Sequence, residues 1–399
     1  MITVRKQYKV VTICGIRPDF IRLSQIIKGL DAHDNIDHIL LHAGQHWKPN
    51  MDKVFFDEFG LREPDINLSV GRDSKTAMEQ IGLLFPRLEE ALEGAKPDAV
   101  VYLGDTNTAV SAIVPARMGI PVVRIEAGMR AYDNSLPEEI NRKAADSIAA
   151  LKISYLPEYK MQLVMEGHEP ETVIVTGNPI VDVVNWGLKK YEINPYEEEE
   201  HRAKDMPWGG KRSYTLATFH RANNILCDDT LDYFVQFINE LAERGEWIIF
   251  SCYYRTADRI KELGLTLHSR IEKREPSNFG HFLLLEAGAS IILTDSGTSQ
   301  EESFLLRKPC MVLRTATERP ETLIYQGGNA TMWACNLDWD LGEYGRLVDM
   351  ASDSKKRNWD TSIYGDGHAS ERIVDAIAKF VESPFVPQAL RSYVIKRFA

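Results

Sequence analysis

The first strand–turn–helix unit of the chain is Val10-Val11-Thr12-Ile13-Cys14-Gly15-Ile16-Arg17-Pro18-Asp19 followed by Phe20–Leu30. The apolar run predicts a buried strand, and the spacing of apolar residues in Phe20–Leu30 predicts an amphipathic helix. The turn between them contains one glycine, so the GxGxxG fingerprint of dinucleotide-binding folds is absent. This unit therefore begins a parallel α/β sheet without the usual NAD or FAD site.

The same alternation of short apolar runs and helical patterns continues along the chain, which predicts a parallel α/β fold. The strands predicted in the first half are Val10–Cys14, His38–His42, Ala99–Leu103, Val122–Ile125, Leu151–Ser154 and Thr172–Val175. Those predicted in the second half are Tyr214–Ala217, Trp247–Cys252, Ser290–Leu293, Cys310–Leu313 and Ala330–Met332.

The length of 399 residues exceeds what one hydrophobic core usually holds, so we expect two domains. The segment Lys189–Tyr214 is rich in Pro, Gly and glutamate and has the composition of a linker. We predict an N-terminal domain over residues 1–190 and a C-terminal domain over 191–368. A helix within 369–399 follows, of a kind that can cross back onto the first domain.

Composition excludes several classes of function. The net charge of −11, without a basic cluster, argues against a nucleic-acid partner. No apolar run is long enough to span a membrane, and the N-terminus lacks a secretory signal. The five scattered cysteines form no CxxC pair and indicate free thiols in a reducing, cytoplasmic compartment. Walker A, HExxH and paired-cysteine patterns are absent, so we predict no metal.

Polar residues follow nearly every predicted strand. Because ligands of open parallel sheets bind beyond the carboxyl ends of the strands, this pattern predicts a site. The residues in these positions are Arg17, Asp19, Gln45, His46, Asp105, Glu126, His220, Arg221, Asp295, Ser296, Gly297, Arg314 and Arg319.

The stretch Thr294–Glu302 joins a strand to a helix through small residues. Free backbone N–H groups and the positive end of the helix dipole would face an anion there, and Ser296 and Gly297 allow close approach of a phosphate. Glu302, one turn inside, suits sugar hydroxyls better. The alternative is an ordinary helix start with Ser296 as the N-cap.

Other candidates also have structural alternatives. Arg17 can belong to a surface loop, and Arg22 can extend an anion clamp or be solvated. Asp105 can cap a helix, Glu138 can be an ordinary first-turn acid, and His220 can be a core histidine. The polar neighbours Arg221, Asn223 and Asn224 favour a functional role for His220.

A series of motifs resembles the non-hydrolysing UDP-N-acetylglucosamine 2-epimerases in content and order. The match runs from about Val10 to the helix near Ala369. The motifs are Gly15-Ile16-Arg17-Pro18-Asp19, Gly44-Gln45-His46, Gly104-Asp105-Thr106, Glu126-Ala127-Gly128-Met129-Arg130, Pro137-Glu138-Glu139-Ile140-Asn141-Arg142, Gly177-Asn178-Pro179, His220-Arg221, Asp295-Ser296-Gly297 through Gln300-Glu301-Glu302, and Thr317-Glu318-Arg319-Pro320-Glu321.

The resemblance implies a GT-B-like fold, with two Rossmann-like domains facing a cleft that holds a UDP-sugar, and a homodimer without a cofactor. It assigns acid/base roles to Asp105, Glu126, Glu138 and His220. It assigns UDP contacts to Arg17, Arg22, Arg142, Phe282, Ser296, Gly297, Glu302 and Arg319. It places Gln45 and His46 near a second, regulatory substrate site.

Some positions differ from the family pattern. Ile16 and Asp19 stand where Thr and Glu are usual, Arg22 replaces a lysine, and Ser251-Cys252-Tyr253 replaces Pro-Val-His. We expect Tyr253 to contact the sugar in place of that histidine, and Arg255 to face a polar or anionic substituent. The alternative is that Tyr253 packs in the core and Arg255 is solvated.

The pair Arg255-Thr256 and the Met129–Asn141 region are closer to relatives that epimerise UDP-2,3-diacetamido-glucuronate. The function implied is interconversion of UDP-N-acetylglucosamine and UDP-N-acetylmannosamine, with that glucuronate-type reaction as an alternative. A GT-B glycosyltransferase, a hydrolysing epimerase and a non-catalytic nucleotide-sugar sensor also stay open, although Arg17-Pro18 argues against the hydrolysing enzyme.

Overall fold

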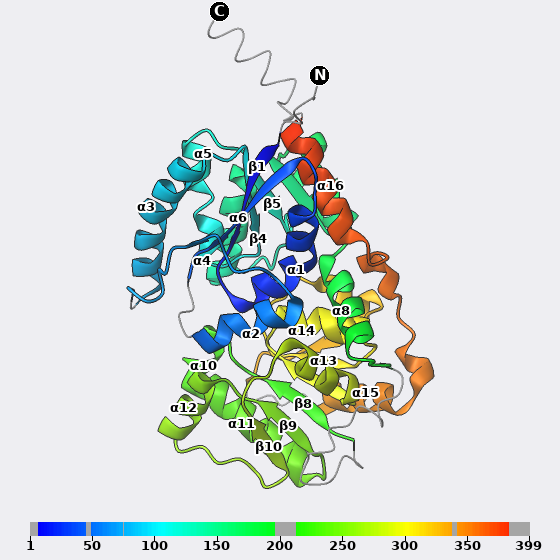
Figure 1. Cartoon of the computed structure of the whole chain (residues 1–399). Helices are drawn as coiled ribbons and strands as arrows, with labels where there is room; N and C mark the ends of the chain where they lie inside the picture. Colours follow the sequence, from blue (N-terminus) through cyan, green and yellow to red (C-terminus); the bar gives the residue numbers. More distant parts are fainter. Residues whose placement is uncertain (1–6, 45–48, 75, 196–212, 337–340, 383–399) are drawn as a thin grey trace, which may run out of the picture. The chain divides into compact units, whose positions relative to one another are not determined.

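The computed structural model describes residues 7–44, 49–74, 76–195, 213–336 and 341–382. The chain forms two compact units, one of residues 1–183 with 362–399 and the other of residues 184–361. The division falls within helix α8 (Pro179–Lys190). Figure 1 shows the elements of each unit.

Unit 1 contains a seven-stranded sheet in the order β3-β2-β1-β4-β5-β6-β7, and every pair of neighbours is parallel. The strands are β1 (Tyr8–Cys14), β2 (Ile36–His42), β3 (Ile66–Asn67), β4 (Ala99–Leu103), β5 (Val122–Ile125), β6 (Leu151–Ser154) and β7 (Val173–Val175). The helices are α1 (Arg17–Asp31), α2 (Pro49–Phe59), α3 (Ala77–Ala95), α4 (Asn107–Val110), α5 (Ile113–Arg117), α6 (Pro137–Ile148), α7 (Pro157–Met165), η1 (Pro170–Thr172) and α16 (Ala369–Glu382).

Unit 2 repeats this arrangement with a six-stranded parallel sheet in the order β10-β9-β8-β11-β12-β13. The strands are β8 (Thr215–Thr218), β9 (Ile248–Ser251), β10 (Ile271–Arg274), β11 (Ile291–Thr294), β12 (Cys310–Val312) and β13 (Ala330–Met332). The helices are α10 (Ala222–Ile225), α11 (Asp228–Glu243), α12 (Tyr254–Glu262), α13 (Phe279–Gly288), α14 (Gly297–Leu305), α15 (Leu341–Ser352), η2 (Pro320–Thr322), η3 (Ile324–Gln326) and η4 (Ser354–Arg357), and η5 (Thr361–Tyr364) follows at the return to unit 1.

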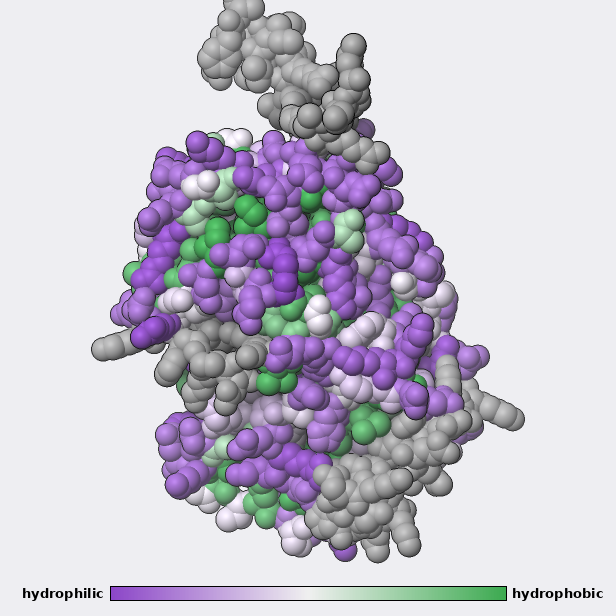
Figure 2. All heavy atoms as spheres, in the orientation of Figure 1, coloured by the Kyte–Doolittle hydropathy of each residue, from purple (hydrophilic) through white to green (hydrophobic). Residues whose placement is uncertain are grey.

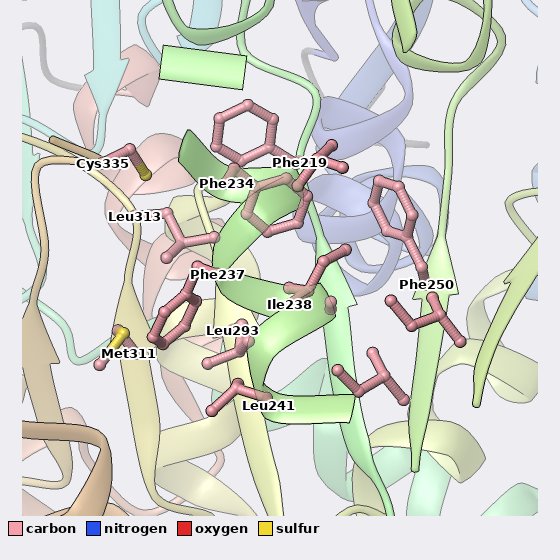
Figure 3. Close-up of a cluster of buried hydrophobic side chains, with 14 of the residues drawn as sticks. Phe219, Phe234, Phe237, Ile238, Leu241, Phe250, Leu293, Met311, Leu313 and Cys335 are labelled. Carbon is pink, nitrogen blue, oxygen red and sulfur yellow. The ribbon is translucent and has the colours of Figure 1, made fainter. Parts of the chain in front are cut away.

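Both faces of the unit 2 sheet are buried. Successive side chains of its strands point to opposite sides, and each side packs into a hydrophobic core of its own. Phe250, Leu293 and Met311 pack with α11 and α15 on one face, whereas Ile249 and Ile292 pack on the other. Figure 3 shows the first of these cores, where Phe234, Phe237, Ile238 and Leu241 of α11 lie against the strands. The rings of Phe219 and Phe234 stack with centroids 4.2 Å apart. This contact anchors the chain directly before His220.

The C-terminal helix α16 belongs to unit 1 and packs against α1, beside which it is drawn in Figure 1. Asp182 accepts hydrogen bonds from the backbone N–H groups of Ala369 (3.2 Å) and Ser370 (2.9 Å), which caps the helix. The chain therefore returns to the first unit at its end.

Both sheets have a point where the order of strands reverses, between β1 and β4 in unit 1 and between β8 and β11 in unit 2. At such a point the connections leave in opposite directions and open a crevice beyond the strand ends, which is where ligands of these folds bind. The residues that directly follow these four strands are therefore the first to consider.

Candidate functional site

At the reversal point of unit 1, Asp19 follows β1 and is almost completely buried. Its Oδ2 accepts hydrogen bonds from the backbone N–H groups of Gly15 (2.9 Å) and Ile16 (3.1 Å), whereas Oδ1 is buried without a hydrogen bond to any described residue. Burial raises the pKa of Asp19 to about 6, against the opposing effect of Arg22 and the two N–H groups. An ionisable group with a pKa near neutrality is thus built into this strand end.

Gly104, which follows β4, lies close to the Asp19 side chain. A Cβ on Gly104 would lie 3.3 Å from Arg22 Nη2, 3.4 Å from Asp19 Oδ1 and 3.9 Å from Glu126 Oε2. The residue also has φ of +78°, which favours glycine. Asp19, Arg22 and Glu126 are therefore gathered around one glycine.

Glu126 follows β5 and is a non-glycine residue with φ of +70°. Its buried carboxylate accepts a short hydrogen bond from Arg22 Nη1. Backbone strain of this kind costs about 1–3 kcal/mol and persists at functional sites where the surroundings hold it. Arg22 is thus neither solvated nor free, because it is buried against this carboxylate.

The loop after Glu126 is held by a buried ionic network. Asp146 Oδ2 accepts hydrogen bonds from the backbone N–H of Gly128 (3.1 Å) and from Arg130 Nη1 (2.7 Å). The guanidinium of Arg130 also forms two parallel bonds to Glu166, at 2.8 and 2.6 Å. Because Asp146 and Arg130 are buried, these bonds fix the path of the loop that carries Glu126.

Asp105, the next residue after Gly104, is paired with Arg142 of α6. The Asp105 carboxylate accepts a short hydrogen bond from Arg142 Nη2, and its backbone carbonyl accepts one from Asn141 Nδ2 at 2.8 Å. Thr106, rather than Asp105, caps the following helix by accepting from the N–H of Thr108 at 3.3 Å. The alternative of Asp105 as a helix cap is therefore wrong.

The adjacent acids Glu138 and Glu139 have different surroundings at the start of α6. Glu139 is fully buried and accepts hydrogen bonds from Arg142 (3.0 Å) and from the backbone N–H groups of Ala131 (2.9 Å) and Tyr132 (3.2 Å). Glu138 is half-buried and has no hydrogen-bond or ion-pair partner within the described ranges. Glu139 thus has a structural role, and Glu138 is available for a ligand.

Arg17 lies at the start of α1 with its guanidinium 4.5 Å from the centre of the Phe55 ring. This contact fixes the side chain by a cation–π interaction. Gln45 and His46, predicted near a regulatory site, lie outside the described residues.

At the reversal point of unit 2, His220 follows β8 and Asp295 follows β11. Nδ1 of His220 lies 3.0 Å from Oδ1 of Asp295. Oδ2 of the same carboxylate accepts hydrogen bonds from the backbone N–H groups of His220 and Arg221, both at 2.8 Å. Burial alone would raise the pKa of Asp295, but His220 and these N–H groups hold it below its usual range. Asp295 is therefore ionised although it is buried.

Tyr253, the residue before α12, lies beside His220 with ring centroids 4.8 Å apart. It is half-buried, so the alternative of a core tyrosine is wrong. Arg255 is exposed, and its guanidinium packs on the ring of Tyr254 and donates to the Tyr254 hydroxyl at 3.2 Å.

The turn before α14 is both an ordinary helix start with Ser296 as its N-cap and a candidate anion site. The Ser296 hydroxyl accepts from the N–H of Ser299 at 3.3 Å and is therefore an N-cap. The N–H groups of Gly297 and Thr298 form no hydrogen bond to a described residue. The positive end of α14 thus keeps two donors for an anion. Glu302 lies one turn further on and is buried.

Arg319 lies directly behind this turn. Its guanidinium contacts Glu301 (Nε to Oε1, 3.0 Å) and Glu318, and a Cβ on Gly297 would meet Arg319 Nη1 at 2.4 Å. Arg319 is buried, so its charge acts beside the helix end while two carboxylates hold its position. Phe282 of α13 is half-buried against the core on the other face of the sheet.

The structure thus gathers the predicted residues into two groups, one in each unit. Arg22, Asp105, Glu126 and Arg142 lie together in unit 1. In unit 2, His220 and Tyr253 lie together, and Ser296 and Gly297 form the α14 turn with Arg319 behind it. Asp19 also belongs to the first group and Asp295 lies beside His220, although the sequence predicts no specific role for either. The sequence feature that could identify them is their position after a strand, and the structure adds that both side chains are buried.

Two further features are absent from the described ranges. No helix there is long and apolar enough to cross a membrane. The same ranges contain no cluster of three or more His, Cys, Asp or Glu residues arranged to hold a metal ion.

Two parallel sheets of Rossmann-like order, each with charged residues at its reversal point, define a two-domain α/β protein of the GT-B-like class. Residues 28–378 match the profile of the UDP-N-acetylglucosamine 2-epimerases, and the chain belongs to this family.

The relatives agree over nearly the whole chain. The UDP-N-acetylglucosamine 2-epimerase of Methanocaldococcus jannaschii is 39% identical over 375 residues, which cover 92% of this chain and 98% of that protein. The crystal structure of the M. jannaschii enzyme with UDP-GlcNAc and UDP has a TM-score of 0.83 at 37% identity and covers 93% of this chain and 99% of that one. The Neisseria meningitidis enzyme bound to UDP-GlcNAc has a TM-score of 0.83 at 28% identity, with coverages of 93% and 100%.

Proposed function

We propose that the chain interconverts UDP-N-acetylglucosamine and UDP-N-acetylmannosamine without hydrolysis. Family membership and the similarity to enzymes of this name support the activity. The observation that carries the proposal is the group of carboxylates and arginines at the reversal point of unit 1, with His220 and the α14 turn at that of unit 2. These carboxylates, arginines and histidine are the residue types that proton transfer and diphosphate binding require.

The difficult step is removal of the proton from C2 of the sugar, because no neighbouring carbonyl makes that C–H bond acidic. Elimination avoids the difficulty: the C1–O bond to UDP breaks as C2 loses its proton, and a glycal forms. UDP then adds back to C1 after C2 is protonated on the other face. The reaction therefore needs an anion site for UDP and at least two acid/base groups.

The anion site is assigned to unit 2. The free N–H groups of Gly297 and Thr298 and the dipole of α14 would stabilise the charge on the leaving diphosphate. Arg319 adds positive charge behind the turn, and Arg17 and Arg142 are further candidates for UDP contacts. Glu302 would accept hydrogen bonds from sugar hydroxyls, and Phe282 would contact the uracil end.

The acid/base groups are assigned to Asp105, Glu126, Glu138 and His220. Glu138 is available because Glu139 makes the structural contacts at the start of α6. Asp19, with its pKa of about 6, adds a buried group that can hold a proton close to Glu126.

Turnover in D2O tests this function. Purified protein is incubated with UDP-N-acetylglucosamine and followed by proton NMR, and we expect the epimer with deuterium at C2. Product with its C2 protium retained would contradict elimination. Free N-acetylmannosamine would indicate hydrolysis, UDP release only with an added acceptor would indicate a glycosyltransferase, and binding without turnover would indicate a sensor.

A second candidate substrate is UDP-2,3-diacetamido-glucuronate. A 2-epimerase of this sugar from Pseudomonas aeruginosa is 29% identical over 374 residues. The exposed guanidinium of Arg255, near Tyr253 in sequence, can pair with a C6 carboxylate. The NMR assay is therefore run on both sugars with Arg255→Ala alongside. If the preference between the sugars is unchanged in that variant, Arg255 does not set specificity.

We further propose that the protein is a cytoplasmic homodimer. Buried Cys252 and Cys310, whose thiol pKa values burial raises to about 11 and about 12, are unreactive thiols that fit a reducing compartment. The homodimer is supported by exposed apolar side chains on neighbouring helices of unit 1, Met78 of α3, Ile113 of α5 and Ile140 of α6. Figure 2 shows hydrophobic side chains gathered on the face over these helices.

A further inference from the structure

The contact between His220 and Asp295 determines which ring nitrogen of His220 is available. Nδ1 lies 3.0 Å from Oδ1 of Asp295. Both atoms are buried, and neither forms a hydrogen bond to any other described group. A buried donor or acceptor without a partner costs about 1–3 kcal/mol, so these two atoms must satisfy each other.

The other oxygen of Asp295 is already fully used. Oδ2 accepts from the N–H groups of His220 and Arg221 and from Nδ2 of Asn224 at 3.3 Å. The two backbone N–H groups, each at 2.8 Å, fix the carboxylate in the plane that points Oδ1 at the imidazole, and the longer contact from Asn224 adds to them. Because an ionised carboxylate can only accept, the hydrogen between Oδ1 and Nδ1 must belong to the ring.

The rest of the ring is held by Tyr253 and open to solvent. The tyrosine ring lies 4.8 Å away, tilted by 34°, and limits rotation of the imidazole. The His220 side chain is 32% exposed although its Nδ1 is buried, so the accessible edge is the one that carries Nε2.

We propose that Asp295 is a positioning residue, which fixes neutral His220 with its hydrogen on Nδ1 and its free lone pair on the accessible Nε2. When Nε2 takes a proton, the imidazolium charge lies beside a carboxylate already in place. The proposal rests on the proposed function, because it gives Nε2 the acid/base role. The role of Asp295 thus differs from that of Asp105, Glu126 and Glu138, which would act on the substrate directly.

The test reads the tautomer directly. Protein labelled with 15N-histidine is measured by long-range proton–nitrogen NMR at a pH where His220 is neutral, and His220→Gln identifies its signals. We expect a protonated Nδ1 and a pyridine-like Nε2 in the native protein. A hydrogen on Nε2 would overturn the proposal, and this measurement needs no variant of Asp295.

Asp295→Asn supplies the second measurement. The amide oxygen can still accept from the two backbone N–H groups, while its NH2 group faces Nδ1 and forces the hydrogen onto Nε2. We expect the tautomer to switch, and kcat to fall by about 10²–10⁴-fold. Kd for UDP should change by less than about threefold. A folded variant that loses activity but keeps its hydrogen on Nδ1 would overturn the proposal, since the loss would then be structural.

Asn224→Ala is the matched control, because it removes one donor to the same carboxylate and leaves Oδ1 and Nδ1 untouched. We expect the native tautomer and a kcat within about threefold of the native value. Native protein that has the predicted tautomer but no epimerase activity would contradict the proposed function and leave the geometry of the pair intact. The two failures are therefore distinguishable.

Discussion

Asp19 is the residue whose environment departs most from its sequence context. A carboxylate in the first turn of a helix would ordinarily be solvated. Here Gly104 and Arg22 enclose it, and its pKa rises to about 6. An ionised carboxylate in that position destabilises the folded protein relative to the neutral acid.

Asp19→Asn should therefore stabilise the protein, and the gain should depend on pH. The folded state binds the Asp19 proton more tightly than the unfolded state, whose pKa is close to 3.8. The native protein thus loses stability as pH rises from about 4 to about 6, by at most about 3 kcal/mol. The variant should melt at a higher temperature than native protein at pH 7.5 and show little difference at pH 4.

Thermal melting of both proteins between pH 4 and pH 8 checks this prediction. Asp57→Asn, at an exposed position of α2 in the same unit, is the control and should give no comparable gain. An Asp19→Asn variant that melts lower than native protein at pH 7.5 would show that the ionised form is needed for folding.

Positions of single residues were predictable where a strand end alone defines them. Asp105, Glu126 and His220 were found because each follows an apolar run. The partner of each was not predictable, because Arg22 reaches Glu126 across 104 positions of sequence and His220 reaches Asp295 across 75. Such pairs depend on strand order, which local patterns do not encode.

At the scale of elements, the α14 turn leaves no room for a side chain at Gly297. A Cβ at this position would lie 2.4 Å from Nη1 of Arg319, whose guanidinium two carboxylates hold. A methyl group at this position must displace a buried ion-paired side chain or shift the start of the helix. Either change moves the free N–H groups that we assign to the diphosphate.

Gly297→Ala should weaken UDP binding by about 10–100-fold, the loss of one hydrogen bond to a charged group. Isothermal titration with UDP measures this directly. Gly345→Ala in α15 of the same unit is the matched control, since its Cβ meets no atom within 4 Å. Native affinity in Gly297→Ala would show that UDP does not approach this helix end.

Most strands were predicted within one or two residues, because buried parallel strands are continuous apolar runs. Two edge strands were missed for a physical reason. β3 is only the pair Ile66–Asn67, and β10 reads Ile271-Glu272-Lys273-Arg274. Neither segment contains an apolar run, because β3 has two residues and β10 has three charged ones, which an edge strand tolerates since it is covered on fewer sides.

At the scale of the whole molecule, the same strand order occurs in both units, and each places its charged residues at its own reversal point. Composition and length predicted two such units. The return of the last helix to unit 1 involves packing against α1 and the cap from Asp182, a contact between residues 187 positions apart. The homodimer is the remaining prediction at this scale.

The exposed apolar face of unit 1 should be the contact between two copies. Met78 is 73% exposed and Ile140 is 57% exposed, on helices that both flank α4: Gln80 of α3 contacts Asn107 at 3.5 Å, and Asn141 of α6 contacts Asp105. Apolar side chains this exposed mark interfaces when they occur together, and a stable dimer buries about 1,200–2,000 Å².

Light scattering after size exclusion should give about twice the chain mass of 45.3 kDa at micromolar concentration. Ile140→Lys should shift the protein towards the monomer, because a buried lysine without a partner opposes association. Tyr325→Lys, at a position 74% exposed in unit 2, should leave the dimer intact. A native monomer would contradict the homodimer, whereas a dimer unaffected by Ile140→Lys would place its interface on another face.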